Sequence, residues 1–278
     1  MLRTRLWMGA VLIALACGVL AVDQFLGPWY PFLLVFILAL ALASCCELVQ
    51  LLESAARPPG WLCYASVALI LAANWPAHLF GESSAWLWLA GTFAAVVLSS
   101  FLVEMATFRE PGGSVVRIAF VVFIVAYLGW LPSFLVQLRW LASVPQSTVA
   151  LALTIFVPKC CDIGAFFTGR LLGHHQMTPV LSPKKTWEGL AGGLAVSALA
   201  AFAINRLGGR LSDLAALGFG VTVGGAGVLG DLAESLIKRD CQKKDASQVV
   251  PGFGGVLDVV DSVLFAAPVA YCWLHRLS

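Results

Sequence analysis

Two short stretches near the C-terminal end place acidic side chains at helical spacing. In GDLAESLIKRD, residues 230–240, four polar side chains follow the i, i+3, i+4, i+7 pattern: Asp231, Glu234, Ser235 and Lys238. In VLDVVDSV, residues 256–263, Asp258 and Asp261 are three apart. Such residues share one face of an α-helix. Aspartates that hold a divalent cation beside basic residues that neutralise phosphate indicate phosphoryl or nucleotidyl transfer.

Cations surround these acidic stretches. Two polar segments, residues 169–189 and 235–262, hold most of them: Arg170, Lys184, Lys185, Lys238, Arg239, Lys243 and Lys244. Attraction of surface loops to anionic lipid explains the sign of this charge. It does not explain why acidic residues lie beside the cations at the ends of apolar segments. A site for a metal ion and a polyanionic substrate explains both.

Each of these patterns also has a purely structural interpretation. The aspartates would then belong to an ion-pair network at helix ends. Lys159 and Asp162, three apart in an apolar segment, would neutralise each other. The PGFGG stretch, residues 251–255, is either a plain turn or a place where backbone N–H groups approach phosphate. His174 and His175 lie in a polar loop and are interpreted as bystanders.

The elements that must position these residues are membrane helices. The 278-residue chain is 60% hydrophobic and 12% charged, with a mean hydropathy of +0.90, whereas a soluble domain carries about twice that charge. A spanning helix needs about 20 mostly apolar residues. The predicted fold class is all-α, a polytopic membrane protein with about nine spans: Leu6–Val22, Pro31–Cys46, Trp61–His78, Ala85–Met105, Val116–Gln137, Thr148–Thr168, Gly189–Ile204, Leu214–Ala233 and Val256–Trp273.

Positive charge predicts the orientation of these helices. With a cytoplasmic N-terminus, twelve of the 17 Lys and Arg residues lie in cytoplasmic segments and four lie outside, while Lys159 lies within a helix. The basic start and apolar run at the N-terminus are similar to a secretory signal, but the many further spans favour a retained first helix. The eight Cys residues have no CxxC spacing, so we expect small buried hydrophobes.

Polar residues divide the chain into two halves within one integral-membrane domain. Residues 1–147 are expected to be N-terminal scaffold helices, and residues 148–278 to be the C-terminal helices with the catalytic loops. Four acidic residues flank the cytoplasmic ends of the scaffold helices. We expect them to be solvated and assign them no chemistry: Glu47, Glu53, Glu104 and Glu110.

At the C-terminal residues the chain resembles the phosphatidate cytidylyltransferases, the integral-membrane CDP-diacylglycerol synthases. Their signature contains Ser-x-x-Lys-Arg, Lys-Asp, Pro-Gly-His-Gly-Gly and Asp-Arg-x-Asp-Ser. The matching residues are Ser235, Lys238, Arg239, Lys244, Asp245, Pro251, Gly252, Gly254, Gly255, Asp258, Asp261 and Ser262. SPKKTWEG, residues 182–189, also fits. The resemblance is specific over about residues 159–262.

The resemblance implies a reaction in which CTP and phosphatidate give CDP-diacylglycerol and diphosphate. The lipid phosphate is already a nucleophile, so catalysis would be positioning and charge neutralisation. The resemblance implies four catalytic residues, Asp231, Lys238, Asp258 and Asp261, of which the three aspartates would hold Mg²⁺. The implied substrate-binding residues are Ser182, Lys184, Lys185, Ser235, Arg239, Lys244, Gly254 and Gly255.

Two positions depart from the signature. Phe253 stands where the family has His, and Val259 where it has Arg. Three alternatives therefore stay open: a related membrane transferase with another phosphorylated lipid acceptor, a catalytically weakened lipid-binding paralogue, and an ion-coupled transporter. A transporter would have acidic residues near the bilayer midplane and repeated halves, and no internal repeat is visible in the sequence.

The expected partners are CTP, phosphatidate and the bilayer, with no nucleic acid, and a homodimer is an open alternative. The resemblance favours a multi-pass protein of a bacterial cell inner membrane, with its active site on the cytoplasmic face, where CTP is found.

Overall fold

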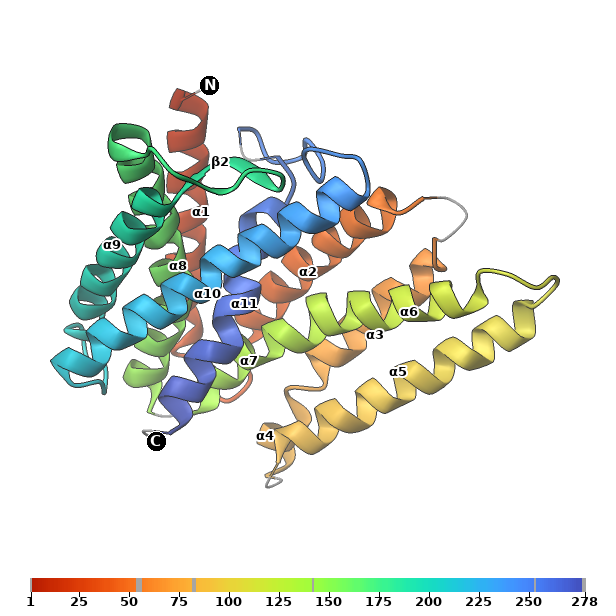
Figure 1. Cartoon of the computed structure of the whole chain (residues 1–278). Helices are drawn as coiled ribbons and strands as arrows, with labels where there is room; N and C mark the ends of the chain where they lie inside the picture. The colour runs from red at the N-terminus through yellow and green to blue at the C-terminus, as the bar shows by residue number, and fades with distance from the viewer. Residues whose placement is uncertain (1, 54–56, 82–83, 142, 253, 277–278) are drawn as a thin grey trace. The chain divides into compact units, whose positions relative to one another are not determined.

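The structure is a computed structural model that describes every residue except 1, 54–56, 82–83, 142, 253 and 277–278. It consists almost entirely of helices (Figure 1). In chain order these are α1 (Leu2–Asp23), α2 (Pro31–Leu51), α3 (Gly60–Ala72), α4 (Pro76–Phe80), α5 (Ala85–Thr107), α6 (Ser114–Val125), the π-helical η1 (Ala126–Trp130), α7 (Leu131–Gln137), the 3₁₀-helical η2 (Leu138–Trp140), α8 (Val144–Leu172), α9 (Trp187–Asn205), α10 (Asp213–Asp240) and α11 (Leu257–His275).

The predicted all-α polytopic fold is confirmed. Within the described residues, eight helical segments are long and apolar enough to cross a membrane. In this count α3 and α4 form one segment, and α6 to η2 form another. The remaining predicted span corresponds to α1, whose described apolar stretch, Trp7–Asp23, is shorter. Each of the nine predicted spans therefore falls on helical residues, although a turn at residues 73–75 divides Trp61–His78 between α3 and α4. The chain is a multi-pass membrane protein.

One element departs from the all-helical prediction. The polar segment after α8 contains an antiparallel β-hairpin of β1 (Gln176–Thr178) and β2 (Ser182–Thr186). The Thr186 hydroxyl then accepts a hydrogen bond from the Gly189 N–H at 3.1 Å and caps α9. Such a cap satisfies one of the unpaired amides at a helix N-terminus. The lysine-bearing strand thus leads without a loop into the next helix.

Contacts divide the chain into two compact units. The first unit consists of residues 1–136 and 245–259, and the second of residues 137–244 and 260–278. The predicted division after residue 147 concerns function and stays a prediction. The contact-based bounds differ from it because a segment near residue 250 packs with the N-terminal helices.

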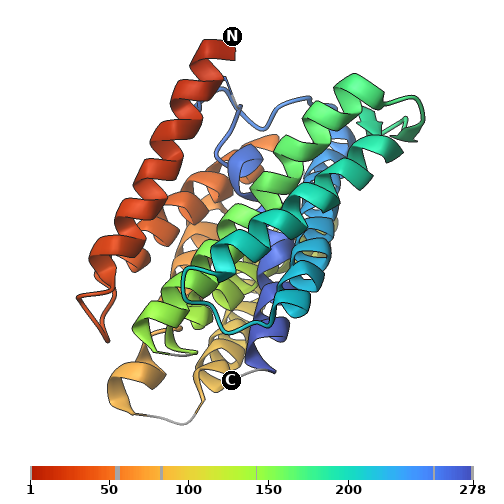
Figure 2. The ribbon, with the colours of Figure 1, turned by 90° about the vertical axis from the view of Figure 1, so that its left-hand side faces the viewer.

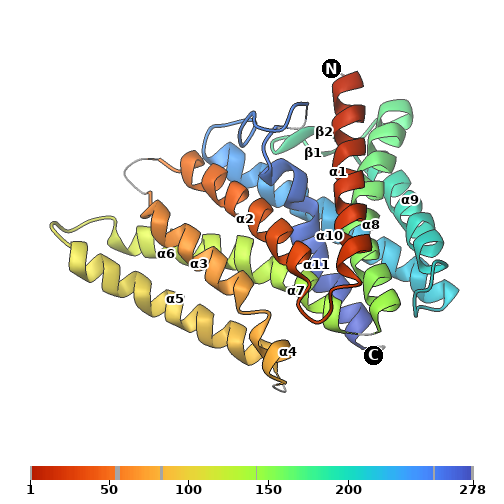
Figure 3. The ribbon, with the colours of Figure 1, turned by 180° about the vertical axis from the view of Figure 1, so that it is seen from behind.

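In the first unit, α3 packs against α2, α5 and α6 (Figure 3). Its buried face is apolar and includes Val67, Ile70 and Leu71. One polar contact crosses this core, because the Asn74 side-chain amide donates to the Ser133 hydroxyl at 3.0 Å.

In the second unit, α8, α9 and α10 pack against one another, and α8 and α9 lie side by side (green and teal in Figure 2). Small residues allow this approach. A Cβ on Gly193 of α9 would lie 2.7 Å from the Cys161 carbonyl oxygen of α8, and a Cβ on Gly164 would lie 2.7 Å from Val196. The second unit therefore brings helix backbones close together around the polar residues that interrupt α8 and α10.

Candidate active site

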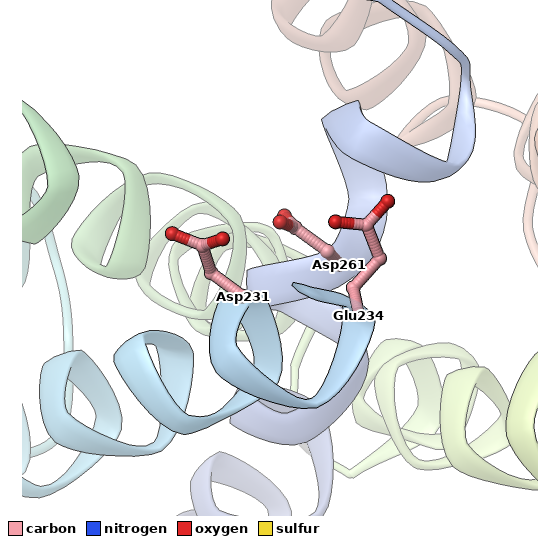
Figure 4. Close-up of side chains that lie close together, drawn as sticks. All are labelled: Asp231, Glu234 and Asp261. Carbon is pink, nitrogen blue, oxygen red and sulfur yellow. The ribbon is translucent and has the colours of Figure 1, made fainter. Parts of the chain in front are cut away.

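Three carboxylates of the second unit converge. Asp231 and Glu234 project from α10, and Asp261 projects from α11 toward them (Figure 4). One oxygen of each lies within 4.8 Å of the others. Glu234 is 1% exposed and Asp261 is 5% exposed. Removing charged groups from water is expensive unless they have charged partners, so the surroundings of this carboxylate trio matter.

Each carboxylate of the trio pairs with a different lysine. The ammonium nitrogen of Lys185 lies 2.7 Å from Asp231 Oδ2, that of Lys238 lies 2.5 Å from Glu234 Oε2, and that of Lys159 lies 3.3 Å from Asp261 Oδ1. The lysines come from β2, α10 and α8. Each carboxylate of the trio therefore has a counter-charge within the second unit.

A glycine lets the two acidic helices meet. A Cβ on Gly230 would lie 2.5 Å from the Asp261 carbonyl oxygen and 3.1 Å from both Ser262 Cα and Phe265 Cβ. Real Cβ atoms essentially never approach another atom under 3.0 Å. The absence of a side chain at Gly230 therefore allows α10 to touch α11 directly beside Asp231.

A cavity of about 230 Å³ in the second unit includes one member of the trio, Asp231, in its wall. Its other charged lining residues are Asp162, Lys184 and Lys185, and its apolar lining includes Phe166 and Leu190. Asp162 Oδ2 is 3.9 Å from the Lys159 ammonium. The interpretation that Lys159 and Asp162 form a pair is therefore confirmed, but Lys159 lies closer to Asp261.

The hairpin that carries Lys184 and Lys185 is held against α8 and α9. Gly169, Gly173 and Gly189 all face Thr186, and a Cβ on any of them would lie within 3.0 Å of its hydroxyl oxygen. From α10, the Arg239 Nε donates to the Leu181 carbonyl at 3.5 Å. The strand is thus tied to three helices, which limits the positions open to its lysines.

The loop with the two histidines is also held in place. Glu188 accepts hydrogen bonds from the backbone N–H groups of His174 and His175 at 3.2 Å. Its other oxygen lies 2.5 Å from His175 Nδ1. These contacts fix the hairpin base, and both histidines are exposed, as expected of bystanders.

Asp258 and the glycine-rich turn belong to the first unit. Asp258 Oδ2 accepts from the N–H groups of Gly255 at 2.7 Å and Ala246 at 3.3 Å. The Gly254 N–H donates to the Val250 carbonyl at 3.0 Å, at a φ of +113°. The N–H groups of Gly254 and Gly255 are thus hydrogen-bonded within the chain. Of the two interpretations of this stretch, the structure agrees with a plain turn.

The remaining predicted site residues lie at the polar edge of the second unit. Ser182 begins β2 and Ser235 lies on α10, both half-buried, whereas Arg239 and Lys244 are exposed. No described contact joins Ser182, Ser235 or Lys244 to the trio. Their roles toward substrate stay predictions.

The sequence interpretation missed three carboxylate or lysine roles. The sequence places Glu234 on the acidic face without predicting it as a ligand, and it suggests only Asp162 as a partner of Lys159. Glu47 was expected to be solvated, which is wrong, because it is 5% exposed. Glu104 was also expected to be solvated, yet it is buried and paired with Arg117 at 2.7 Å. Glu53 and Glu110 are exposed, as predicted.

Of the two residues that depart from the signature, Phe253 and Val259, the structure describes only Val259. Phe253 lies outside the described residues. Val259 is half-buried in the first turn of α11, and its N–H donates to the Val256 carbonyl at 3.0 Å.

Sequence comparison decides the family. Residues 3–277 match the cytidylyltransferase family. The chain belongs to this family. A phosphatidate cytidylyltransferase of Haemophilus influenzae is 39% identical over 130 residues, which are 45% of this chain and 45% of that protein. An uncharacterized protein of Escherichia coli, YnbB, is 34% identical over 156 residues, which are 54% of this chain and 52% of that protein.

Another relative matches over a longer range. A phosphatidate cytidylyltransferase of Synechocystis is 31% identical over 245 residues, which are 76% of this chain and 77% of that protein. The match to the Haemophilus and Escherichia proteins spans about half the length of each. The predicted family resemblance is confirmed. Membership of the cytidylyltransferase family does not agree with an ion-coupled transporter.

Proposed function

We propose that this member of the cytidylyltransferase family is a phosphatidate cytidylyltransferase, a CTP-dependent enzyme of phospholipid biosynthesis. It transfers the cytidylyl group of CTP to phosphatidate, forming CDP-diacylglycerol and releasing diphosphate. Family membership supports the cytidylyl donor, and the names of two relatives support the acceptor.

One observation carries the proposal. A membrane-spanning helical unit gathers three carboxylates and three lysines beside a cavity. Three of these charged residues are buried and three are half-buried, and so many charges in and beside membrane helices are expensive and indicate function. At about 230 Å³ the cavity is smaller than the roughly 300–1,000 Å³ of most ligand pockets, so it suits part of a nucleotide. The lysines at its wall favour the phosphate end.

The carboxylate trio fits a magnesium ion. Carboxylate oxygens are ligands that Mg²⁺ prefers. The trio offers three of them within 4.8 Å of one another, so rotation of the side chains would bring them to one ion. Asp231, Glu234 and Asp261 would hold the ion, and Asp258 stays a predicted ligand. When bound, Mg²⁺ neutralises charge on the phosphate oxygens and polarises the phosphorus.

Lysines stabilise the negative charge of the phosphates and of the leaving diphosphate. An oxygen of the lipid phosphate attacks the α-phosphorus of CTP, and the bond from that phosphorus to the bridging oxygen breaks. The electron pair leaves with diphosphate, so charge moves toward the leaving group. Lys184 and Lys185 line the cavity, and their ammonium groups stabilise that charge without proton transfer. Lys159 and Lys238, which pair with Asp261 and Glu234, would add further positive charge beside the phosphates.

The protein functions in the cell inner membrane with this site facing the cytoplasm. The excess of Lys and Arg in the predicted cytoplasmic segments supports this orientation, and so does the need to reach soluble CTP.

Purified protein in detergent, supplied with CTP, Mg²⁺ and phosphatidate, tests the proposal. We expect CDP-diacylglycerol and diphosphate in equal amounts, with loss of activity in EDTA and recovery on adding Mg²⁺. Absence of the product under all lipid compositions would contradict it.

A related transferase with a different phosphorylated lipid acceptor is the second candidate. Phe253 and Val259 favour it, because both replace polar residues of the signature with apolar ones. The same assay with a set of phosphorylated lipids separates the two candidates. Activity on another lipid, with none on phosphatidate, would support the second candidate, and no activity on any of them would favour a weakened paralogue.

A further inference from the structure

Glu47 is a buried carboxylate far from the signature in sequence. It lies in the last turns of α2, in the first unit. Its Oε1 accepts from the Ser247 hydroxyl at 2.6 Å and the Val256 N–H at 2.9 Å, and its Oε2 accepts from the Leu257 N–H at 2.8 Å. All three partners belong to the segment that enters α11. One scaffold side chain therefore holds both ends of the glycine-rich turn.

The neighbouring glycine is fitted to this carboxylate. Gly255 is buried, and a Cβ placed on it would lie 2.5 Å from Glu47 Oε2. Asp258 completes the arrangement by accepting from Gly255 and Ala246. Each of the two carboxylates thus bonds residues on both sides of the turn, and the missing side chain of Gly255 makes room for Glu47.

The chemistry of the contact separates Glu47 from an ordinary buried acid. Glu104, the other buried glutamate among the described residues of the first unit, is bound by the Arg117 guanidinium. Every described hydrogen bond of Glu47 instead comes from the turn and the start of α11. Unbonded amides at a helix N-terminus attract negative charge. A carboxylate in this place fixes the direction in which α11 begins.

We infer that Glu47 is a positioning residue for the proposed cytidylyl transfer. It holds the 246–257 segment and Asp258 in the arrangement that the reaction needs, and it contacts no substrate itself. This inference rests on the proposed function. It assigns a role in catalysis to a scaffold helix outside the signature.

The main test compares Glu47→Gln with Glu104→Gln as a matched control. Gln keeps the size of the side chain but replaces one acceptor oxygen with an NH₂ group, which faces the donors of the turn. We expect kcat of Glu47→Gln to fall by about 10–100-fold, as misplacement far from the chemistry can cause, with KM for CTP changed less than about threefold. Glu104→Gln should lower thermal stability and leave kcat within about threefold.

A readout that needs no turnover accompanies the kinetics. Amide hydrogen exchange should rise at Val256 and Leu257 in Glu47→Gln and stay unchanged there in Glu104→Gln. If wild-type protein had no cytidylyltransferase activity, the proposed function would fail, while the exchange result would still report whether Glu47 holds the turn. Unchanged exchange at both amides, or equal loss of kcat in the two variants, would overturn the inference.

A double variant tests the fit between Glu47 and Gly255. Gly255→Ala alone should lower kcat by at least about tenfold, because its methyl group displaces the carboxylate. In a Glu47→Ala background the same change should cost less than about threefold, since the space is then open. Equal effects of Gly255→Ala in both backgrounds would show that the two positions act independently.

Discussion

At the scale of single residues, the central feature is that each carboxylate of the trio already has a lysine. Without bound metal, the charges of Asp231, Glu234 and Asp261 are balanced by Lys185, Lys238 and Lys159. A dication that entered alone would meet these ammonium groups, and a triphosphate that entered alone would meet the carboxylates. On the proposed function, we therefore expect the metal ion and the nucleotide to bind together.

Neutralising the acidic residues tests whether they hold a metal. Asp231→Asn, Glu234→Gln, Asp258→Asn and Asp261→Asn should each lower turnover by at least about 10²-fold, because the amide keeps the shape but loses the charge that Mg²⁺ needs. The measurement is CDP-diacylglycerol formation by purified variants, with membrane insertion checked for each. Asp213→Asn, an exposed aspartate paired with Arg206, is the control. Near-normal activity in two or more variants would show that these residues form a structural ion-pair network and do not hold a catalytic metal.

Lys159 offers a test of competition between lysine and metal. Lys159→Met should tighten Mg²⁺ binding without nucleotide by about tenfold, which corresponds to about 1.4 kcal/mol, because the ammonium beside Asp261 no longer opposes the cation. Turnover should fall at the same time, since a phosphate-neutralising charge is lost. Isothermal titration of Mg²⁺ into nucleotide-free protein measures the first effect. Lys243→Met, an exposed lysine, should change neither quantity, and weaker Mg²⁺ binding in Lys159→Met would contradict the competition.

At the scale of elements, glycine contacts set how closely α10 approaches α11. Gly230→Ala would place a methyl group against the Asp261 carbonyl and push the two helices apart, so we expect turnover to fall by at least about tenfold. Gly225→Ala is a control on the same helix, because its Cβ would meet only Leu194 at 3.8 Å. Kinetics and thermal unfolding of both variants give the comparison. Similar activity of the two would mean that helix spacing does not limit the site.

The membrane helices were predictable from hydropathy alone, and every predicted span falls on helical residues. The β-hairpin was not, because its strands are short and polar and owe their position to Thr186 and the glycines around it. Spacing within a helix predicted Asp231 and Asp261 as members of one acidic cluster, but not that Glu234 joins them or that Asp258 bonds to the glycine-rich turn. The role of Glu47 was not predictable, because its partners lie 200–210 residues away, and no periodicity reports a contact at that separation.

At the scale of the whole molecule, the orientation of the polar segments is open to a direct measurement. In a background whose eight native cysteines are replaced, Gln176→Cys and Gln248→Cys should not react with a membrane-impermeant maleimide in intact cells, because their segments carry the cytoplasmic charge excess. Both should react after permeabilisation. Leu207→Cys, in the segment between α9 and α10 that is predicted to be outside, is the positive control. Labelling of either glutamine position from outside would contradict a cytoplasmic site.

The two acidic partners of Lys159, Asp162 and Asp261, are synthesised at different times. Asp261 is synthesised 102 residues after Lys159, and at about 5–20 residues per second this takes about 5–20 s. During that time a lone ammonium in an apolar helix would cost about 2.5–3.5 kcal/mol near the bilayer centre. Asp162 follows Lys159 by three residues in α8, so a temporary partner enters the membrane with it.

We therefore expect Asp162 to matter for membrane insertion as well as for the folded protein. Asp162→Asn should lower the fraction of newly made protein that inserts, measured by protease protection of pulse-labelled chains. Removing both charges with Lys159→Gln and Asp162→Asn should restore insertion but not activity. Asp162 would then be the first partner that neutralises the charge of Lys159 during synthesis, before Asp261 has been made.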